Sequence, residues 1–189
     1  YAAAASVVSA TADLGPNDDL DLDGMTNREE YEQFGSKPVG ATQWVDCTTG
    51  DDTYDGSSPT YLGGLAGPKK NIQTALDAAG DGDTVMVMPG TCFGALNRNL
   101  DFQGKGKVLR SVTGSAGTII DAEGQGRCFN FATQETNASA VVGFTMQNGM
   151  ADFGGGIQIL NAARPQVNDS ILRNNAATTS GGALYIERA

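Results

Sequence analysis

The sequence predicts an all-β solenoid built from short parallel strands, and three observations lead to this fold class. The C-terminal half repeats, since Asn148 and Asn175 lie 27 residues apart and so do Gly154 and Gly181. Each copy holds two short apolar runs, one ended by asparagine and one opened by glycines, with no helical pattern between them. The 189 residues include 26 glycines and only 7% aromatic residues, which favours many tight turns over a helical bundle.

A coil of such strands explains the choice of residues. Successive coils lie about 4.8 Å apart and pair in parallel, so the apolar side chains of one coil stack on those of the next. Ile157 and Ile159 should stack on Leu184 and Ile186, while glycine and asparagine take the corners that need a positive φ. The 106 residues from Thr84 onward give about four coils. A β-sandwich with accidental similarity between two hairpins is the alternative.

Two segments are expected to precede the solenoid. Residues 1–12 are small and apolar and are interpreted as an N-terminal arm. Residues 13–40 form an acidic module. Residues 1–55 hold 12 acidic residues against Arg28 and Lys37, so this part carries the whole net charge of −10. Such crowding of like charges favours a bound divalent cation.

A twelve-residue calcium loop is predicted inside the acidic module. It starts at Asp19, has carboxylates at its first, third and fifth positions, and has Gly24 at the sixth, where the chain must turn sharply. The expected Ca²⁺ ligands are Asp19, Asp21, Asp23, Met25 through its carbonyl, Asn27 and Glu30. Pro16 and Asn17 break the helix that precedes the loop in a complete EF-hand. A solvated acidic linker is the alternative interpretation.

Residues 41–93 are expected to form the N-terminal cap of the solenoid, and residues 94–189 its coils. A helix is predicted over residues 68–79, because Pro68 suits a first turn and Gly80 a stop. Its apolar residues share one face: Ile72, Ala75, Leu76 and Ala79. This single apolar stripe should lie over the end or side of a sheet. A strand over residues 83–88 follows, closed by a Pro-Gly turn.

Composition excludes several classes of function. The chain has no histidine, so histidine-ligated zinc and Ser-His-Asp or Cys-His catalysis are excluded. Its acidity opposes nucleic-acid binding, and no apolar run reaches 18 residues, so no membrane span is expected. A second acidic turn contains Asp51, Asp52 and Asp55. These side chains either bind a second cation or cap the turn by hydrogen bonds to its backbone.

Several short motifs occur in a specific order: WVD at 44–46, GDDTYDG at 50–56, GPKKNIQTALDAA at 67–79, GDTV at 82–85 and NRNLDFQGK at 97–105. In these the chain resembles secreted bacterial right-handed parallel β-helix proteins of the pectate-lyase-like superfamily. The resemblance covers about residues 44–189 and implies a right-handed β-helix and a secreted or cell-surface location. The calcium loop is similar to the half-hand modules of dockerin and thrombospondin-type repeats.

The three cysteines allow two states. Proteins that the chain resembles usually carry an aromatic residue where Cys92 stands, so this cysteine needs a reason of its own. A disulfide with Cys47 would join the cap to the first coil and leave Cys128 as a small buried residue. Three reduced, buried thiols are the alternative.

The sequence favours an extracellular structural, surface or adhesive role over catalysis. The enzyme alternative is a carbohydrate-active lyase or hydrolase, which needs clustered acidic and basic side chains. The solenoid offers scattered candidates for that role, Arg110, Asp121, Arg127 and Arg173.

The expected partners follow from the same interpretation. Residues 183–189 stop inside a coil, so either a longer protein continues the stack or another molecule covers it. Head-to-tail self-association into a filament, with residues 1–12 adding a strand, is the expected assembly. A polysaccharide or cell-surface ligand is the other expected partner.

Overall fold

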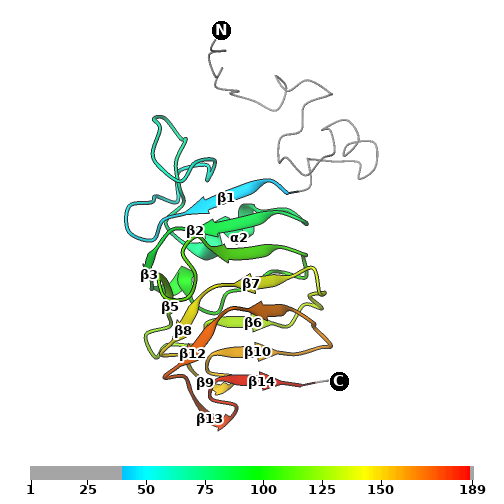
Figure 1. Ribbon diagram of the computed structural model, residues 1–189. Coiled ribbons are helices and arrows are strands. Elements are labelled where there is room, and N and C mark those ends of the chain that lie inside the picture. Colours follow the sequence, from blue (N-terminus) through cyan, green and yellow to red (C-terminus); the bar gives the residue numbers. More distant parts are fainter. Residues whose placement is uncertain (1–39, 188–189) are drawn as a thin grey trace, which may run out of the picture. The chain divides into compact units, whose positions relative to one another are not determined.

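The computed structural model describes residues 40–187 (Figure 1). The expected N-terminal arm, and the calcium module apart from its last residue, therefore lie outside the described residues. The helices are α2 (Ile72–Ala78) and the 3-10 helix η2 (Ala95–Asn97). The strands are β1 (Thr42–Val45), β2 (Thr84–Val87), β3 (Gly90–Cys92), β4 (Val108–Ser111), β5 (Thr118–Asp121), β6 (Phe129–Phe131), β7 (Ala140–Val142), β8 (Thr145–Gln147), β9 (Met150–Phe153), β10 (Ile157–Ile159), β11 (Gln166–Asn168), β12 (Ile171–Arg173), β13 (Ala176–Ser180) and β14 (Leu184–Ile186).

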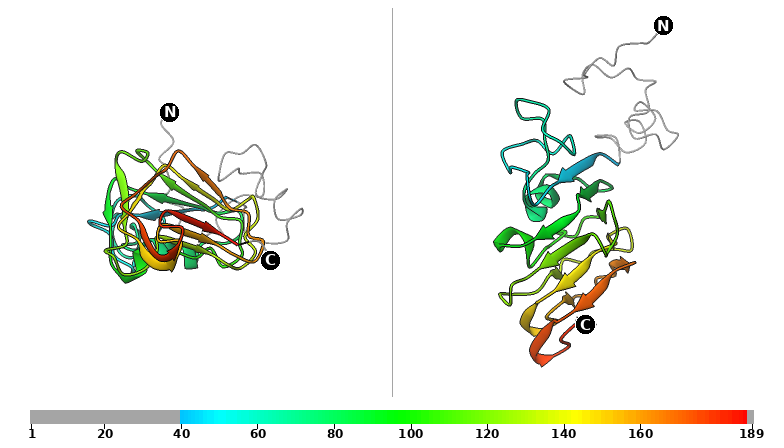
Figure 2. Two further views of the ribbon diagram at one scale, coloured as in Figure 1. Left: turned by 90° about the horizontal axis from the view of Figure 1, so that it is seen from below. Right: turned by 60° about the vertical axis from the view of Figure 1, so that its left-hand side comes forward.

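These strands form a parallel β-solenoid of about four turns. The longest sheet has the order β1-β2-β4-β7-β11, the next β3-β5-β8-β12, and shorter sheets pair β6-β10-β14 and β9-β13. Every pairing between these strands is parallel, because the chain returns to each sheet once per coil. Seen along the stack, the coils overlie one another (Figure 2). The predicted solenoid is thus confirmed, and the antiparallel sandwich is excluded.

The strand register corrects the repeat length read from the sequence. Thr145 of β8 pairs with Ile171 of β12, 26 residues later, whereas Ile157 of β10 pairs with Leu184 of β14, 27 residues later. The extra residue is taken up between β9 and β13, where the register shifts. Asn148 therefore corresponds to Asn174 at the corner, and not to Asn175 as the 27-residue spacing indicated. Both corner asparagines have a positive φ, 56° and 55°.

The core consists of side-chain columns that run from coil to coil. Phe129, Ile157 and Leu184 form one column, as the register of β6, β10 and β14 shows. Ile157 is only 1% exposed, whereas Leu184, in the last described coil, is 45% exposed. The columns predicted from the repeat are therefore confirmed. Among residues 40–187, no helix is long and apolar enough to cross a membrane.

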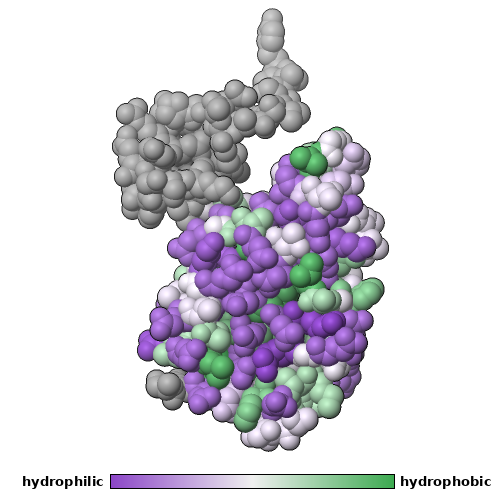
Figure 3. Space-filling model, turned by 180° about the vertical axis from the view of Figure 1, so that it is seen from behind, coloured by the Kyte–Doolittle hydropathy of each residue, from purple (hydrophilic) through white to green (hydrophobic). Residues whose placement is uncertain are grey.

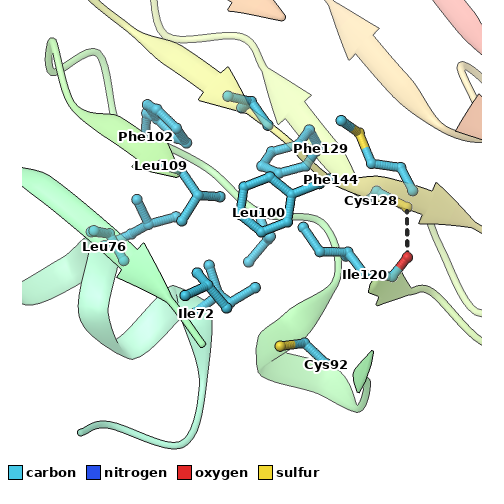
Figure 4. Close-up of a cluster of buried hydrophobic side chains, with 14 of the residues drawn as sticks. Ile72, Leu76, Cys92, Leu100, Phe102, Leu109, Ile120, Cys128, Phe129 and Phe144 are labelled. Carbon is cyan, nitrogen blue, oxygen red and sulfur yellow. Dashed lines mark hydrogen bonds between the residues drawn. The ribbon is translucent and has the colours of Figure 1, made fainter. Parts of the chain in front are cut away.

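The upper coils hold an aromatic cluster (Figure 4). The Phe102 ring meets the rings of Phe129 and Phe131 edge to face, with centroids 6.5 Å and 5.3 Å away. Leu100 and Leu109 lie in the same cluster and, like these rings, are fully buried. Such interlocked packing lets each coil cover the apolar face of its neighbour.

Helix α2 is shorter than predicted, beginning at Ile72 and not at Pro68. Residues 68 and 69 instead continue beside β1, where Lys69 exchanges backbone hydrogen bonds with Trp44 and Asp46. Side chains from distant segments hold the amides at the start of the helix. Asn97 accepts from the amide of Ile72, the first helical residue, and Asp52 accepts from the amides of Lys70 and Asn71 just before it. These long-range caps decide where the helix begins.

The end of α2 is also fixed by tertiary contacts. Gly80 is not left-handed, contrary to the expected glycine stop, and its amide donates to the Asp83 carboxylate (2.6 Å). The Leu76 carbonyl accepts from the buried ammonium group of Lys107 (2.5 Å), a cation at the negative end of the helix. Burial lowers the pKa of Lys107, the nearby charge of Lys105 adds to this, and neighbouring carboxylates oppose it. The helix packs against β1, β2 and η2.

Candidate functional site

Three polar side chains form a column on the outer surface of the sheet β3-β5-β8-β12. Asp121 ends β5, Gln147 ends β8 and Arg173 ends β12, and the strand register places them beside one another in that order. The residue before each of them packs into the core. Because side chains alternate along a strand, the three polar groups point outward. We call this set, together with Asn148, the polar ladder.

The Asp121 carboxylate is held by four hydrogen bonds from its own chain. Its Oδ1 accepts from the Glu123 amide (2.8 Å) and the Asn148 side chain (3.1 Å). Its Oδ2 accepts from Gln147 Nε2 (2.7 Å) and again from Asn148 (2.9 Å). A carboxylate offers about four lone-pair positions, so these bonds fill them. Asp121 therefore fastens one coil to the next.

The electrostatic environment keeps this carboxylate ionised. Partial burial alone would raise the pKa of Asp121. The hydrogen bonds from Gln147, Glu123 and Asn148, and the positive charge of Arg173, outweigh burial and lower the pKa below its ordinary value. A general acid needs the opposite shift, toward a protonated form near neutral pH. The geometry thus suits a structural acceptor and not a proton donor.

Arg173 extends the ladder to a third coil. Its Nε donates to Gln147 Oε1 (2.8 Å), so the order across the coils is carboxylate, amide and guanidinium. Arg173 forms no ion pair within residues 40–187. The one ion pair in this part of the chain joins Arg98 to Glu123 (2.9 Å), near the Asp121 end of the ladder. Arg173 is exposed, so an anionic group in solution can approach its guanidinium group.

The other sequence candidates lie elsewhere. Arg110 is on β4, between Met86 and Val142, in the five-stranded sheet. Arg127 precedes β6 and donates to the Phe153 carbonyl (3.1 Å). Burial lowers the pKa of Arg127, while the charge of Asp152 opposes that shift. Of the four residues considered for catalysis, the structure brings together only Asp121 and Arg173.

The sequence analysis did not identify Gln147 and Asn148, whose side-chain amides lie between Asp121 and Arg173. Asp121, Gln147 and Arg173 follow one another at equal steps of 26 residues. This equal spacing was the signal available in the sequence. It was concealed by the spacing of 27 residues between Gly154 and Gly181, which lie beyond the register shift. Asn148 enters the ladder from the corner that follows β8.

The proposed metal ligands Asp19, Asp21, Asp23, Met25, Asn27 and Glu30 lie outside the described residues. Within residues 40–187, no group of three or more acidic or cysteine side chains is arranged to hold a metal ion. In the acidic turn, Asp51 accepts from the Thr53 amide (2.8 Å) and Asp55 from the Ser57 amide (2.9 Å). Asp52 caps the start of α2. Side-chain capping accounts for all three residues.

Cys47 and Cys92 form a disulfide, with their Cα atoms 5.2 Å apart and a separation of 45 positions along the chain. It joins the segment after β1 to β3. Cys128 is a free, fully buried thiol, 3.9 Å from the Ile120 carbonyl (Figure 4). Burial, and secondarily the charge of Asp121, raises the pKa of Cys128 to about 12. At neutral pH this thiol is therefore protonated and inert.

Comparisons with protein-family models, with curated proteins and with solved structures give no match to this chain. The fold alone defines the class, a parallel β-solenoid. Its candidate site is the polar ladder on the outer surface of β5, β8 and β12.

Proposed function

We propose that the chain is an extracellular right-handed parallel β-helix of the pectate-lyase-like kind with a structural, surface or adhesive role, including that of a filament subunit. The observation that supports this most is the hydrogen bonding of the Asp121 carboxylate. Its oxygen atoms are filled by hydrogen bonds from Gln147, Asn148 and Glu123. A carboxylate used in this way stabilises the stack and offers no lone pair to a metal ion or a substrate proton.

General rules of chain connection support the finer features of the fold. Crossovers between parallel strands of one sheet are right-handed in the great majority of proteins, which favours right-handed coils here. Helix α2 contacts β1 and β2, the first strands of the five-stranded sheet. This position is consistent with an N-terminal cap, which would shield the first coil from pairing with other chains.

The disulfide supports an extracellular location. Disulfides persist in oxidising compartments and are rare in the cytosol. An extracellular location also supplies the millimolar Ca²⁺ that weak structural sites require. We therefore assign Ca²⁺ to the loop from Asp19 to Glu30, as a structural ion.

Chelation tests the calcium assignment. Removing Ca²⁺ leaves the carboxylates of the loop crowded together, so residues 13–38 should be cleaved much faster by protease while the coils keep their protection. The measurement is limited proteolysis with mass spectrometry, with and without chelator. The matched variant Asp19→Asn with Asp21→Asn should lose the calcium dependence. Equal protection of residues 13–38 under both conditions would contradict the assignment.

A carbohydrate-active enzyme is the second candidate, because the structure brings Asp121 and Arg173 into one column. The structural proposal predicts that the whole chain releases neither reducing ends nor unsaturated products from pectins, alginate or glucans. Arg110→Gln is a matched control, since Arg110 is also exposed but lies in another sheet. Product release that is lost in Asp121→Asn and in Arg173→Gln, but kept in Arg110→Gln, would overturn the structural proposal.

A further inference from the structure

An uncharged hairpin projects from the first coil. Residues 56–68 contain no charged side chain, although the chain carries 34 of them. At the end of this segment Tyr61, Leu62 and Leu65 are 58%, 71% and 65% exposed. We call these three residues the apolar tip. The segment extends beyond β1 in Figures 1 and 2, and it forms the upper right end of the coloured surface in Figure 3, where hydrophobic atoms stand among paler ones.

The tip is held in place by a hydrogen-bonded turn. Leu62 N donates to the Ala66 carbonyl (2.9 Å), and Ala66 N donates to the Gly63 carbonyl (3.1 Å). Gly63 and Gly64 have φ values of 109° and 61°. The first of these is strained for any residue with a side chain, and glycine adopts both readily. Open space surrounds both glycines. The close turn therefore fixes the positions of the two leucines without packing them against the protein.

The base of the hairpin is fixed as firmly as its end. Asp55 N donates to the Leu65 carbonyl (2.8 Å), and the ammonium group of Lys69 donates to the Tyr54 carbonyl (2.6 Å). The Tyr54 ring stacks on Tyr61 with centroids 5.0 Å apart. A preorganised hairpin loses little further conformational entropy when it contacts a partner.

Folding does not explain this arrangement. Exposed leucines contribute little to the free energy of folding, and the buried core contains none of the three tip residues. Leu62 and Leu65 lie one on each side of the glycine pair, so both project from the same turn. Apolar side chains held in water by a rigid turn indicate a contact surface.

We propose that the apolar tip docks onto a lipid surface made of zwitterionic lipids. Three side chains fall far short of the roughly 800 Å² per partner that a stable protein interface buries. A bilayer needs no matching surface, and tyrosine and leucine are favoured at its interface. The residues that flank the hairpin in the sequence carry nearly balanced charges, three carboxylates against Lys69 and Lys70, so they supply no excess of positive charge for anionic lipids.

The test is flotation of the whole 189-residue protein with phosphatidylcholine vesicles at increasing lipid concentration. We expect partition into the vesicle fraction that is insensitive to salt. Leu62→Ser and Leu65→Ser should each weaken partition about tenfold, and together should abolish it. Leu96→Ser is the matched control, because Leu96 is 46% exposed but lies outside the hairpin. Thermal unfolding should be the same for the natural chain and all four variants.

Each other outcome overturns the proposal. Absence of flotation at millimolar lipid would do so, and so would flotation that survives in the Leu62→Ser, Leu65→Ser double variant. Binding restricted to anionic phosphatidylserine vesicles and lost in salt would place the contact on charged residues elsewhere. Self-association without lipid, seen by light scattering and lost in the double variant, would make a second copy of the chain the partner. The glycan and calcium experiments remain independent of all these results.

Discussion

Replacing Cys47 and Cys92 together with alanine is expected to lower the free energy of unfolding by about 4 kcal/mol. The two residues close a loop of 45 residues, and the chain-entropy treatment gives this magnitude for a loop of that length. The disulfide restricts the unfolded chain, so its loss favours unfolding even where the native coils are unchanged. Urea unfolding of the two proteins, followed by far-UV circular dichroism, measures the difference.

Cys128→Ser is the control for the disulfide, because it removes a thiol and leaves the bond between Cys47 and Cys92 intact. Added reductant should destabilise this variant as strongly as the natural chain, and should leave the double alanine variant unaffected. A loss below about 1 kcal/mol in the double variant would show that the covalent bond adds little to stability, and the expected 4 kcal/mol would then be wrong.

Alkaline pH is expected to destabilise the protein through Cys128. The pKa of this thiol is about 12 in the folded protein, against 9.0 for an unperturbed thiol. Above pH 9 the unfolded chain releases the proton and the folded chain retains it, so the unfolded state binds fewer protons. The free energy of unfolding therefore falls as pH rises from 9 toward 12, by about 2.5 kcal/mol between pH 8 and pH 11 from this group.

Cys128→Ser isolates that contribution. A serine hydroxyl does not titrate in this range, while all other groups of the protein are shared. The difference in unfolding free energy between the two proteins should change by about 2.5 kcal/mol over the same pH interval, with the natural chain losing more. Parallel pH profiles of the two proteins would contradict the raised pKa, and would mean that the thiol is open to solvent.

The sequence by itself determined the fold class. The corners of the coils need a positive φ, which glycine and asparagine adopt most readily. Along each short strand, side chains point alternately to the core and to the surface. Both requirements are local, so they leave a pattern in the sequence. The columns that continue Ile157 and Ile159 into the last coil could therefore be read from the repeat and are present. The turn around Asp51 and Asp55 was also readable, because its hydrogen bonds join residues two apart.

The tertiary structure decided what depends on residues far apart in the sequence. The start of α2 is set by Asp52 and Asn97, which lie about 20 and 25 residues from the amides that they cap. The polar ladder exists because the register places Asp121, Gln147 and Arg173 at steps of 26 residues, and one extra residue between β9 and β13 concealed that step. The register is set by the packed stack, because it is fixed by which apolar side chains stack in the core, and the outer side chains pair as a consequence.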